Sequence, residues 1–326
     1  MRARLAWADP ERVDPQDLFA EIRCETAEAF LDELSPARGR LWAEARRESR
    51  TGRDWIFRGV MDAGFPLRPS ALRDGAFAAY AFDEGGSTVR TASEQRAAER
   101  HLMDRFCAEA DSLGIHLPGD RPELRDRRCA QPEDDPHEFP PINRLHMFAL
   151  AQHYGIPTRL LDWTRRPVIA AYFAVEALAA QRRAGLRGQG PCAVWVLDAA
   201  AIDRLSRDAS SDPTIDPAVF LVTAPRATNP NLAAQGGLFT LVQPRTGDPH
   251  PVPDLDEALR RVAPKLSGPG PVLCRITLPP AEARVTLRML ADEGVHAATV
   301  RPGLDGVVET LRERSNHQWA HPGHRT

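Results

Sequence analysis

Lysine is almost absent from this chain, and no long apolar run occurs in it. Lys265 is the single lysine among 42 basic residues, a skew typical of genomic base composition rather than of phosphate recognition. The formal net charge of −3 gives no overall basic surface for nucleic acid or for an anionic membrane. No stretch approaches the ~20 apolar residues of a transmembrane helix, and the polar N-terminus contains no apolar signal segment. We therefore expect a cytoplasmic protein without a membrane partner, and nucleic-acid binding stays an open alternative.

Cysteine is scarce as well. The five cysteines are widely spaced and odd in number, at Cys24, Cys107, Cys129, Cys192 and Cys274. No two of them form a CxxC pair, and none clusters with histidine at the spacing of a metal site. These observations predict reduced thiols and no bound metal.

Composition and patterning favour an α+β protein. With 42% hydrophobic residues the chain has ample material for a packed core, and 326 residues allow one large domain or two ordinary ones. The predicted strands and helices are segregated unevenly along the sequence, which argues against a regular βαβ array. We expect a central mixed or antiparallel sheet, a helical N-terminal cap and C-terminal helices.

Local patterns predict the individual helices and strands. The first prediction is an N-terminal helical segment over 1–50, in which the helical pattern starts at residue 15. Strands are predicted over Asp54–Val60, Cys192–Leu197, a stretch running through Val242, and Val272–Leu278; helices are predicted over Glu94–Leu113, Ile142–Gln152, Thr164–Ala184, Leu255–Val262, Ala281–Asp292 and Leu304–Arg314. Residues 74–90 have the pattern of a mobile loop, and 116–141, with six prolines, that of an irregular insertion. The tail from 315 to 326 is polar.

The stretch Ala149–Ala174, ALAQHYGIPTRLLDWTRRPVIAAYFA, places chemically useful side chains in a polar loop directly before an apolar helix. These side chains are Gln152, His153, Tyr154, Thr158, Arg159, Asp162, Trp163 and Thr164. Pro167 fits the first turn of a helix that starts near Thr164, with Asp162 or Thr164 as its N-cap. The free N–H groups at such a helix start favour an anion or a phosphate.

Several segments, in the same order along the chain, resemble the FRG domain family of bacteria and phages, which is named for a Phe-Arg-Gly motif. They are Phe57-Arg58-Gly59, PLRPSALR at Pro66–Arg73, AQHYGIPTRLLDWT at Ala151–Thr164 with the helix after it, AQGGLFT at Ala234–Thr240, and the closing helices over Leu287–Leu311. The resemblance implies an FRG domain over 51–314, whose C-terminal αβ part covers 272–314. Val60 and Arg301 depart from the family pattern.

Arg58 and His153 each allow a structural and a functional interpretation. Arg58 lies in an otherwise apolar strand, where an unpaired guanidinium is strongly destabilising. It therefore forms a salt bridge with Asp162, serves a ligand, or does both. His153 is either a general base beside Tyr154 or a histidine that satisfies backbone carbonyls in a tight turn.

Three further residues also have two interpretations each. Arg159 either pairs with Asp162 or Glu176, or contacts phosphate. Trp163 either anchors packing at the helix entrance or offers a stacking surface. Gln235, before two glycines and a strand, either lies in a turn that starts the strand or holds a ribose hydroxyl or an amide.

The order of these pieces is more distantly similar to the ADP-ribosyltransferases, and that resemblance implies split sheets and a site for NAD. In this scheme Arg58 would hold the phosphate or ribose of NAD and Thr164 would contact the nicotinamide ribose. Trp163 or Tyr154 would stack on the nicotinamide ring. Gln235 would occupy the position of a glutamate that promotes transfer, although a carboxamide cannot act as a carboxylate.

The resemblance thus implies two overlapping sets of site residues. The catalytic set is Arg58, Asp162, Thr164 and Gln235, with Asp162 as the substitute carboxylate. The NAD-binding set is Arg58, His153, Tyr154, Arg159, Trp163 and Thr164.

Three functions are consistent with these residues. The first is ADP-ribosyl transfer or NAD hydrolysis in a toxin or antiphage protein that acts on an unknown macromolecular target. The second is a module that senses a nucleotide or a phage component without turnover. The third, a nuclease using His153 and Asp162, is the weakest, because a metal nuclease needs several neighbouring carboxylates. The NAD hypothesis requires that Arg58, Trp163 and Gln235 converge on one cavity of dinucleotide size.

Overall fold

A computed structural model describes most of the chain, in eight stretches. They are residues 18–42, 54–80, 90–117, 139–183, 190–225, 229–244, 250–266 and 270–316. The expectations for the first 17 residues, for residues 81–89, for most of the proline-rich insertion and for nearly all of the polar tail lie outside these described residues.

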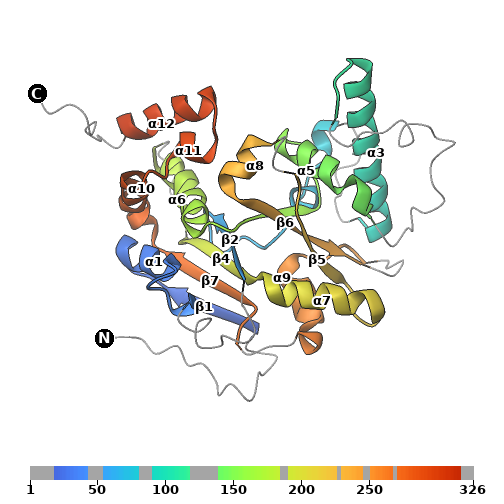
Figure 1. Ribbon diagram of the computed structural model, residues 1–326, viewed down its shortest axis with the longest axis horizontal. Coiled ribbons are helices and arrows are strands. Elements are labelled where there is room, and N and C mark those ends of the chain that lie inside the picture. The colour runs from blue at the N-terminus through green and yellow to red at the C-terminus, as the bar shows by residue number, and fades with distance from the viewer. Residues whose placement is uncertain are drawn as a thin grey trace, which may run out of the picture.

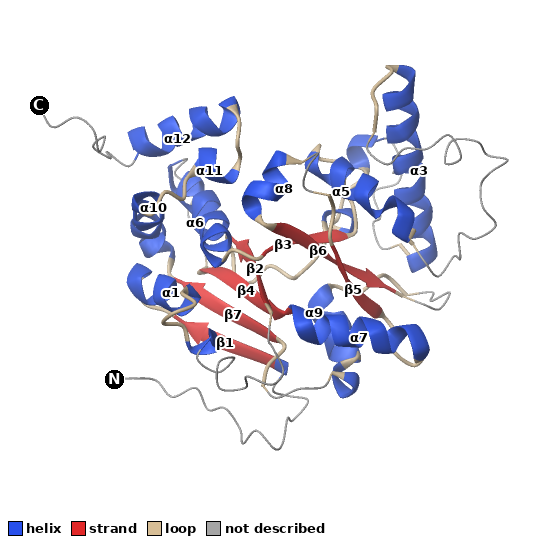
Figure 2. Ribbon diagram, in the orientation of Figure 1, coloured by secondary structure: helices blue, strands red, loops and turns tan. Residues whose placement is uncertain are grey.

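Within the described part of the chain, a seven-stranded mixed sheet organises the molecule (Figure 2). In spatial order the strands are β1 (Phe19–Arg23), β7 (Leu273–Leu278), β4 (Cys192–Asp198), β2 (Trp55–Val60), β3 (Leu160–Thr164), β6 (Gly237–Gln243) and β5 (Ala218–Val222). β1 runs parallel to β7, and every other neighbouring pair is antiparallel. The predicted α+β class with a mixed sheet is confirmed.

The sheet has a seam between β2 and β3. These two strands pair only where Phe57 faces Thr164, whereas every other pair of neighbours is aligned over five or six residues. The strands β1, β7, β4 and β2 therefore form one half of the sheet, and β3, β6 and β5 form the other. The separation of β2 from β3 beyond Phe57 leaves room for side chains between the two halves.

Helices cover both faces of the sheet (Figure 1). They are α1 (Ala27–Leu34), α3 (Ala92–Ser112), α5 (Leu145–His153), α6 (Pro167–Arg183), α7 (Ala199–Ser211), α8 (Pro230–Gln235), α9 (Leu255–Arg261), α10 (Ala283–Asp292), α11 (Ala297–Val300) and α12 (Leu304–Asn316). Short 3-10 turns occupy Ser70–Leu72, Ala78–Tyr80, Ile142–Arg144, Ala263–Lys265 and Pro280–Glu282. None of the helices in the described part of the chain is long and apolar enough to cross a membrane.

Alternation along β4 separates the two main cores. Val194 and Val196 pack with α1, α6 and α10, whereas Leu197 packs with α7 and α9, because successive strand residues point to opposite faces. A third core joins α3 and α5 to the β3–β6 half through Leu160 and Phe239. The seam is thus flanked by different helices on its two sides.

The glycine of the Phe-Arg-Gly motif lets α6 approach β2 closely. A Cβ atom at Gly59 would lie 2.0 Å from the carbonyl oxygen of Ala170 on α6, so any other residue would push helix and strand apart. α6 begins at Pro167, in agreement with the predicted first turn. Asp162 and Thr164 are not its N-cap: the carbonyl of Arg166 accepts the first helical hydrogen bonds, and both residues belong to β3.

Two predicted elements are wrong, and the elements that were not predicted include α7, β5, α8 and α11. Residues 19–23, predicted as helical, form the edge strand β1, whose hydrogen bonds to β7 override a helix-like apolar spacing. Residues 160–164 form the central strand β3. They were predicted within a polar loop because Asp162 interrupts an otherwise buried run. The helix α7 and the strand β5 lie in a stretch for which no element was predicted.

Candidate functional site

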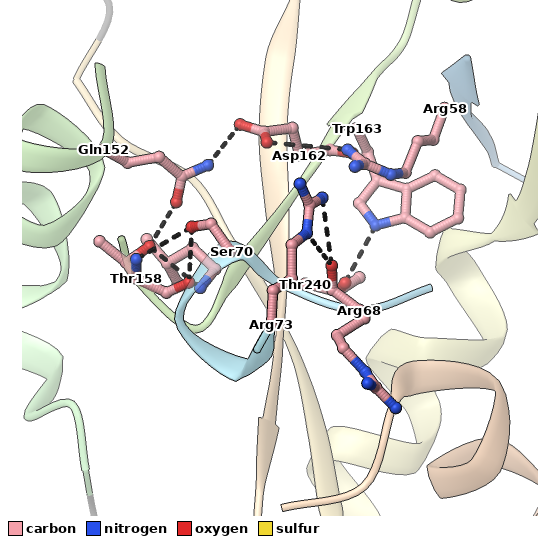
Figure 3. Close-up of polar contacts among 10 residues, drawn as sticks. Arg58, Arg68, Ser70, Arg73, Gln152, Thr158, Asp162, Trp163 and Thr240 are labelled. Carbon is pink, nitrogen blue, oxygen red and sulfur yellow. Dashed lines mark hydrogen bonds and ion pairs between the residues drawn. The ribbon is translucent and has the colours of Figure 1, made fainter. Parts of the chain in front are cut away.

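A cleft of ≈ 220 Å³ opens beside the seam, where β2 and β3 separate. It is lined by Arg58, Ser70, Arg73, Gln152, Gly155, Ile156, Leu160, Leu161 and Asp162. These residues come from β2, from the segment after it, from the end of α5 and from β3. Figure 3 shows the polar ones, which extend toward a common space.

Arg58 bridges the seam from β2. Its Nη1 donates a 3.0 Å hydrogen bond to the carbonyl oxygen of Asp162 and lies 3.7 Å from the Asp162 Oδ2. Only 17% of the side chain is exposed. Burial lowers the pKa of Arg58; the Asp162 charge opposes this shift and the Arg73 charge adds to it. The guanidinium thus contacts Asp162, which was one of its two interpretations, and still faces the cleft with its remaining donors.

Asp162 presents its carboxylate to the cleft. Its side chain is 61% exposed, and its Oδ1 accepts a 2.6 Å hydrogen bond from the amide of Gln152. The amide oxygen of Gln152 in turn accepts a hydrogen bond from the hydroxyl of Thr158. The carboxylate is therefore held at Oδ1 by Gln152, while Oδ2 lies 3.7 Å from Arg58 and accepts no hydrogen bond from the described residues.

Ser70 ties the segment after β2 to the start of β3. The Ser70 hydroxyl donates to the Thr158 carbonyl at 3.2 Å and accepts from the Thr158 N–H at 3.1 Å. The N–H of Ala71 donates to the same carbonyl at 3.0 Å. These bonds fix one wall of the cleft, and with it the position of Arg73 three residues later.

Arg73 is exposed, and its guanidinium is directed toward Asp162 and Arg58 (Figure 3). Its hydrogen bonds are two contacts of 3.4 Å to the carbonyl of Arg68, and none of the described carboxylates pairs with it. Arg68 points away from the cleft, toward Asp254, with which it forms a two-pronged ion pair of 2.8 and 2.9 Å. Arg73 is therefore available to an anion.

Arg159 does not line the cleft. It forms an ion pair with Glu99 at 2.9 Å, and each side chain is 1% exposed. Its guanidinium also lies over the ring of Phe139. The predicted partners are wrong: Asp162 contacts Arg58, and Glu176 pairs with Arg301. Arg159 joins α3 to the start of β3.

Trp163 and Thr164 also lie outside the cleft. The indole of Trp163 is 3% exposed and donates to the hydroxyl of Thr240 at 2.9 Å. Thr164 is buried, and its hydroxyl donates to the carbonyl of Gln235 at 2.5 Å and accepts from the Arg166 N–H at 2.9 Å. Both side chains are used in packing and local hydrogen bonding.

Gln235 ends α8, and Gly236 after it has a φ of 61° that suits a helix C-cap. The strand β6 starts directly after this turn, at Gly237. The Gln235 amide donates to the carbonyl of Val300 at 3.2 Å. The prediction that Arg58, Trp163 and Gln235 line a single cavity is therefore wrong. Alternation along β3 points Trp163 into the core, and Gln235 binds α11 instead.

His153 and Tyr154 lie at the rim, where α5 ends. Both are exposed, and their rings meet edge to face at 5.1 Å. Neither lines the cleft, although Gly155 directly after them does. Among the described residues no group of three or more His, Cys, Asp or Glu side chains could hold a metal ion.

Sequence reasoning assigned no role in the cleft to Ser70, Arg73 or Gln152. Gln152 belongs to the polar stretch before α6, and the other two belong to the PLRPSALR motif at 66–73. Their presence inside family motifs was the available signal. Their direction depends on the hydrogen bonds to Thr158 and Asp162, which no pattern in the sequence reveals.

Residues 53–183 match the family model of the FRG domain. All the residues that line the cleft fall within this matched stretch. No curated protein and no solved structure matches the chain. Over residues 53–183 the chain is therefore similar to the FRG domain, as the motifs within that stretch indicate, and the comparisons lend no support to the more distant resemblance to ADP-ribosyltransferases.

Proposed function

We propose that the cleft binds the nicotinamide half of NAD and that Asp162 promotes cleavage at the nicotinamide ribose, in ADP-ribosyl transfer or NAD hydrolysis. One observation carries this proposal: an exposed carboxylate, Asp162, is held between a guanidinium and an amide in an open cleft. A phosphate of NAD lies against Arg58 and Arg73, whose free N–H donors match phosphate oxygens.

The reaction needs a negative charge near the ribose. The bond between C1′ of the ribose and the nicotinamide nitrogen breaks, and its electron pair leaves with nicotinamide. Water, or a nucleophilic group of an acceptor, adds to C1′ and loses a proton. Asp162 accepts that proton and stabilises the positive charge that develops on the ribose.

The site proposed here differs from the cavity that the ADP-ribosyltransferase scheme required, because Trp163 and Gln235 do not line the cleft. It keeps from that scheme only the role of the glutamate, which it gives to Asp162. It gives no role to Trp163, Thr164 or Gln235, which are buried or hydrogen-bonded elsewhere. Fixed donors at Arg58 and Gln152 support the proposal, because a preorganised site need not rearrange as charge develops.

The test is release of nicotinamide from NAD by the purified protein, with and without a cell lysate as a source of acceptors. We expect Asp162→Asn to lower the rate by about 100-fold or more, because it removes the base, while NAD binding changes little. Arg58→Ala should weaken binding. The matched control is Arg312→Ala, which removes an exposed arginine on α12, and it should change neither quantity.

A binding module without turnover is the second candidate. It is favoured by the partners that Asp162 already has, since one carboxylate oxygen accepts from Gln152 and the other lies 3.7 Å from Arg58. This candidate would be supported if NAD binds in a way that depends on Arg58 but no nicotinamide is released, with or without the cell lysate. Failure of the wild-type protein to bind NAD would contradict both.

A further inference from the structure

A second hollow lies next to the cleft and shares a residue with it. This groove has a volume of ≈ 580 Å³ and lies between the segment 68–74, the start of α3 and residues 250–261. Arg73 lines both the cleft and the groove. The two spaces therefore meet at one guanidinium that has no carboxylate partner among the described residues.

The cleft and the groove differ in volume, and the volumes limit what each can hold. Pockets that enclose a drug-sized ligand measure roughly 300–1,000 Å³. The cleft, at ≈ 220 Å³, lies below this range, and the groove, at ≈ 580 Å³, lies within it. A whole dinucleotide does not fit the cleft alone, whereas one nucleoside in each space, joined at Arg73, uses both.

The charges in the groove suit an uncharged nucleoside rather than a second phosphate. Its lining holds five arginines and four carboxylates. Three of these arginines form ion pairs with three of the carboxylates, in the pairs Arg68–Asp254, Arg260–Asp256 and Arg261–Glu257. When Arg73 is assigned to the phosphate, four arginines and four carboxylates remain, so the groove is nearly balanced.

The groove also offers a surface on which a base can stack. Arg260 lies with its guanidinium 4.5 Å from the ring centroid of Phe19, and 54% of its side chain is exposed. A planar guanidinium of this kind stacks on aromatic rings. Leu72 and Val252 add apolar wall nearby.

We infer that the groove is the subsite for the second nucleoside of a dinucleotide, whose diphosphate lies at Arg73 and whose first nucleoside occupies the cleft. This inference rests on the proposed function, because it assigns the other half of the same ligand. It predicts that both nucleosides of NAD contribute to its affinity, and that the groove recognises the adenosine.

Binding is measured by titration calorimetry on the full chain carrying Asp162→Asn, which keeps NAD intact, with NAD, nicotinamide mononucleotide and AMP as probes. Adding Arg260→Ala should raise the Kd for NAD and AMP about fivefold, the loss expected for one stacked guanidinium. The Kd for nicotinamide mononucleotide should not change. Arg73→Ala should weaken all three ligands, because each contains phosphate. Arg312→Ala, which also removes an exposed arginine paired within its own helix, should have no effect.

The groove assignment is overturned if NAD binds in an Arg58-dependent way while Arg260→Ala leaves the Kd for NAD and AMP unchanged. It is overturned equally if Arg260→Ala weakens the mononucleotide as much as NAD. In both cases the proposed function would stand. If none of the three probes binds, the proposed function itself fails and the assignment fails with it.

Discussion

Gln152 fixes the orientation of the candidate carboxylate through two hydrogen bonds. Its amide nitrogen donates to Asp162 and its amide oxygen accepts from Thr158, so only one orientation of the amide satisfies both neighbours. Thr158 is itself held by Ser70. Gln152 is thus a positioning residue, since it acts on a ligand through Asp162.

Replacing Gln152 by methionine should remove both bonds at similar side-chain volume. We expect kcat for nicotinamide release to fall about tenfold, the effect of a carboxylate that is present but less well placed, with KM within about twofold of the wild-type value. Steady-state kinetics measures this split. A rise in KM at constant kcat would instead indicate that Gln152 binds the ligand.

The buried pair of Arg159 and Glu99 is a second feature at this scale. Both side chains are 1% exposed, and Gln95 donates a further hydrogen bond to Glu99 at 2.8 Å. Removing one charge of such a pair leaves the other uncompensated in the interior. The pair holds α3 against the start of β3, next to the cleft.

Glu99→Gln should therefore lower the free energy of unfolding by about 3–5 kcal/mol, as measured by urea denaturation. The control is Asp32→Asn, which breaks the exposed pair with Arg38 and should cost at most about 0.5 kcal/mol. Equal losses in the two variants would contradict the structural role of the buried pair.

At the scale of elements, the C-terminal helices are attached to α6 by buried polar contacts. The Tyr172 hydroxyl of α6 donates to Glu313 of α12 at 2.5 Å, and the other carboxylate oxygen of Glu313 accepts from the Ala297 N–H at 3.3 Å. Arg301 forms a two-pronged ion pair with Glu176, at 2.7 and 2.8 Å. Burial raises the pKa of Tyr172, so its hydroxyl stays protonated and remains a donor.

Burial also raises the pKa of Glu313; the bonds from Tyr172 and Ala297 oppose this shift, and the charges of Glu176 and Glu309 add to it. A carboxyl whose pKa is higher in the folded state binds more protons there than in the unfolded state. Its contribution to stability is therefore complete below the unfolded pKa and is lost as the pH rises through the folded pKa.

Glu313→Gln keeps an acceptor for Tyr172 and removes this titration. We expect the variant to lack the part of the pH dependence that Glu313 contributes, so that its stability relative to the wild type improves as the pH rises from about 4.3, the ordinary pKa of a glutamate, toward neutral pH. Urea denaturation across this range measures the difference. A constant difference between the two proteins would contradict the assignment.

At the scale of the whole molecule, the seam divides the sheet into two halves beside the cleft. The halves share a single backbone pair, Phe57 with Thr164, and are joined near the cleft by the side chain of Arg58. Regions with few backbone hydrogen bonds open more readily than fully paired strands. A ligand that contacts β2, β3 and the segment 68–73 together should close this opening.

Hydrogen exchange followed by mass spectrometry tests this expectation. Saturating NAD at about 100 times its Kd should slow exchange in β3 and in residues 68–73, with up to about 2.7 kcal/mol of added protection where opening requires release of the ligand. β4 and β7, which pair over six residues, should not respond. Equal protection everywhere would point to general stabilisation rather than to binding at the seam.

Much of the fold could be predicted because its signals are local. The helix α3 follows an apolar spacing and a capping box, Thr91 with Glu94, and the strands β4 and β7 are short apolar runs. β1 and β3 were missed because neighbouring strands decide them: a five-residue edge strand and a strand interrupted by Asp162 carry little pattern of their own. Of the predicted site residues only Arg58 and Asp162 line the cleft.

The sequence by itself determined the motifs that match the FRG domain and the α+β class. It also limited Arg58 to a pair with Asp162, a ligand, or both, because an arginine in an apolar strand must find a partner. Only the tertiary structure decided which polar side chains share a space. The direction of a strand side chain is set by register, and a shift of one residue reverses it. For this reason Trp163 is buried while its neighbour Asp162 faces the cleft, and Gln152 and Arg73, which no periodicity marks, complete the site.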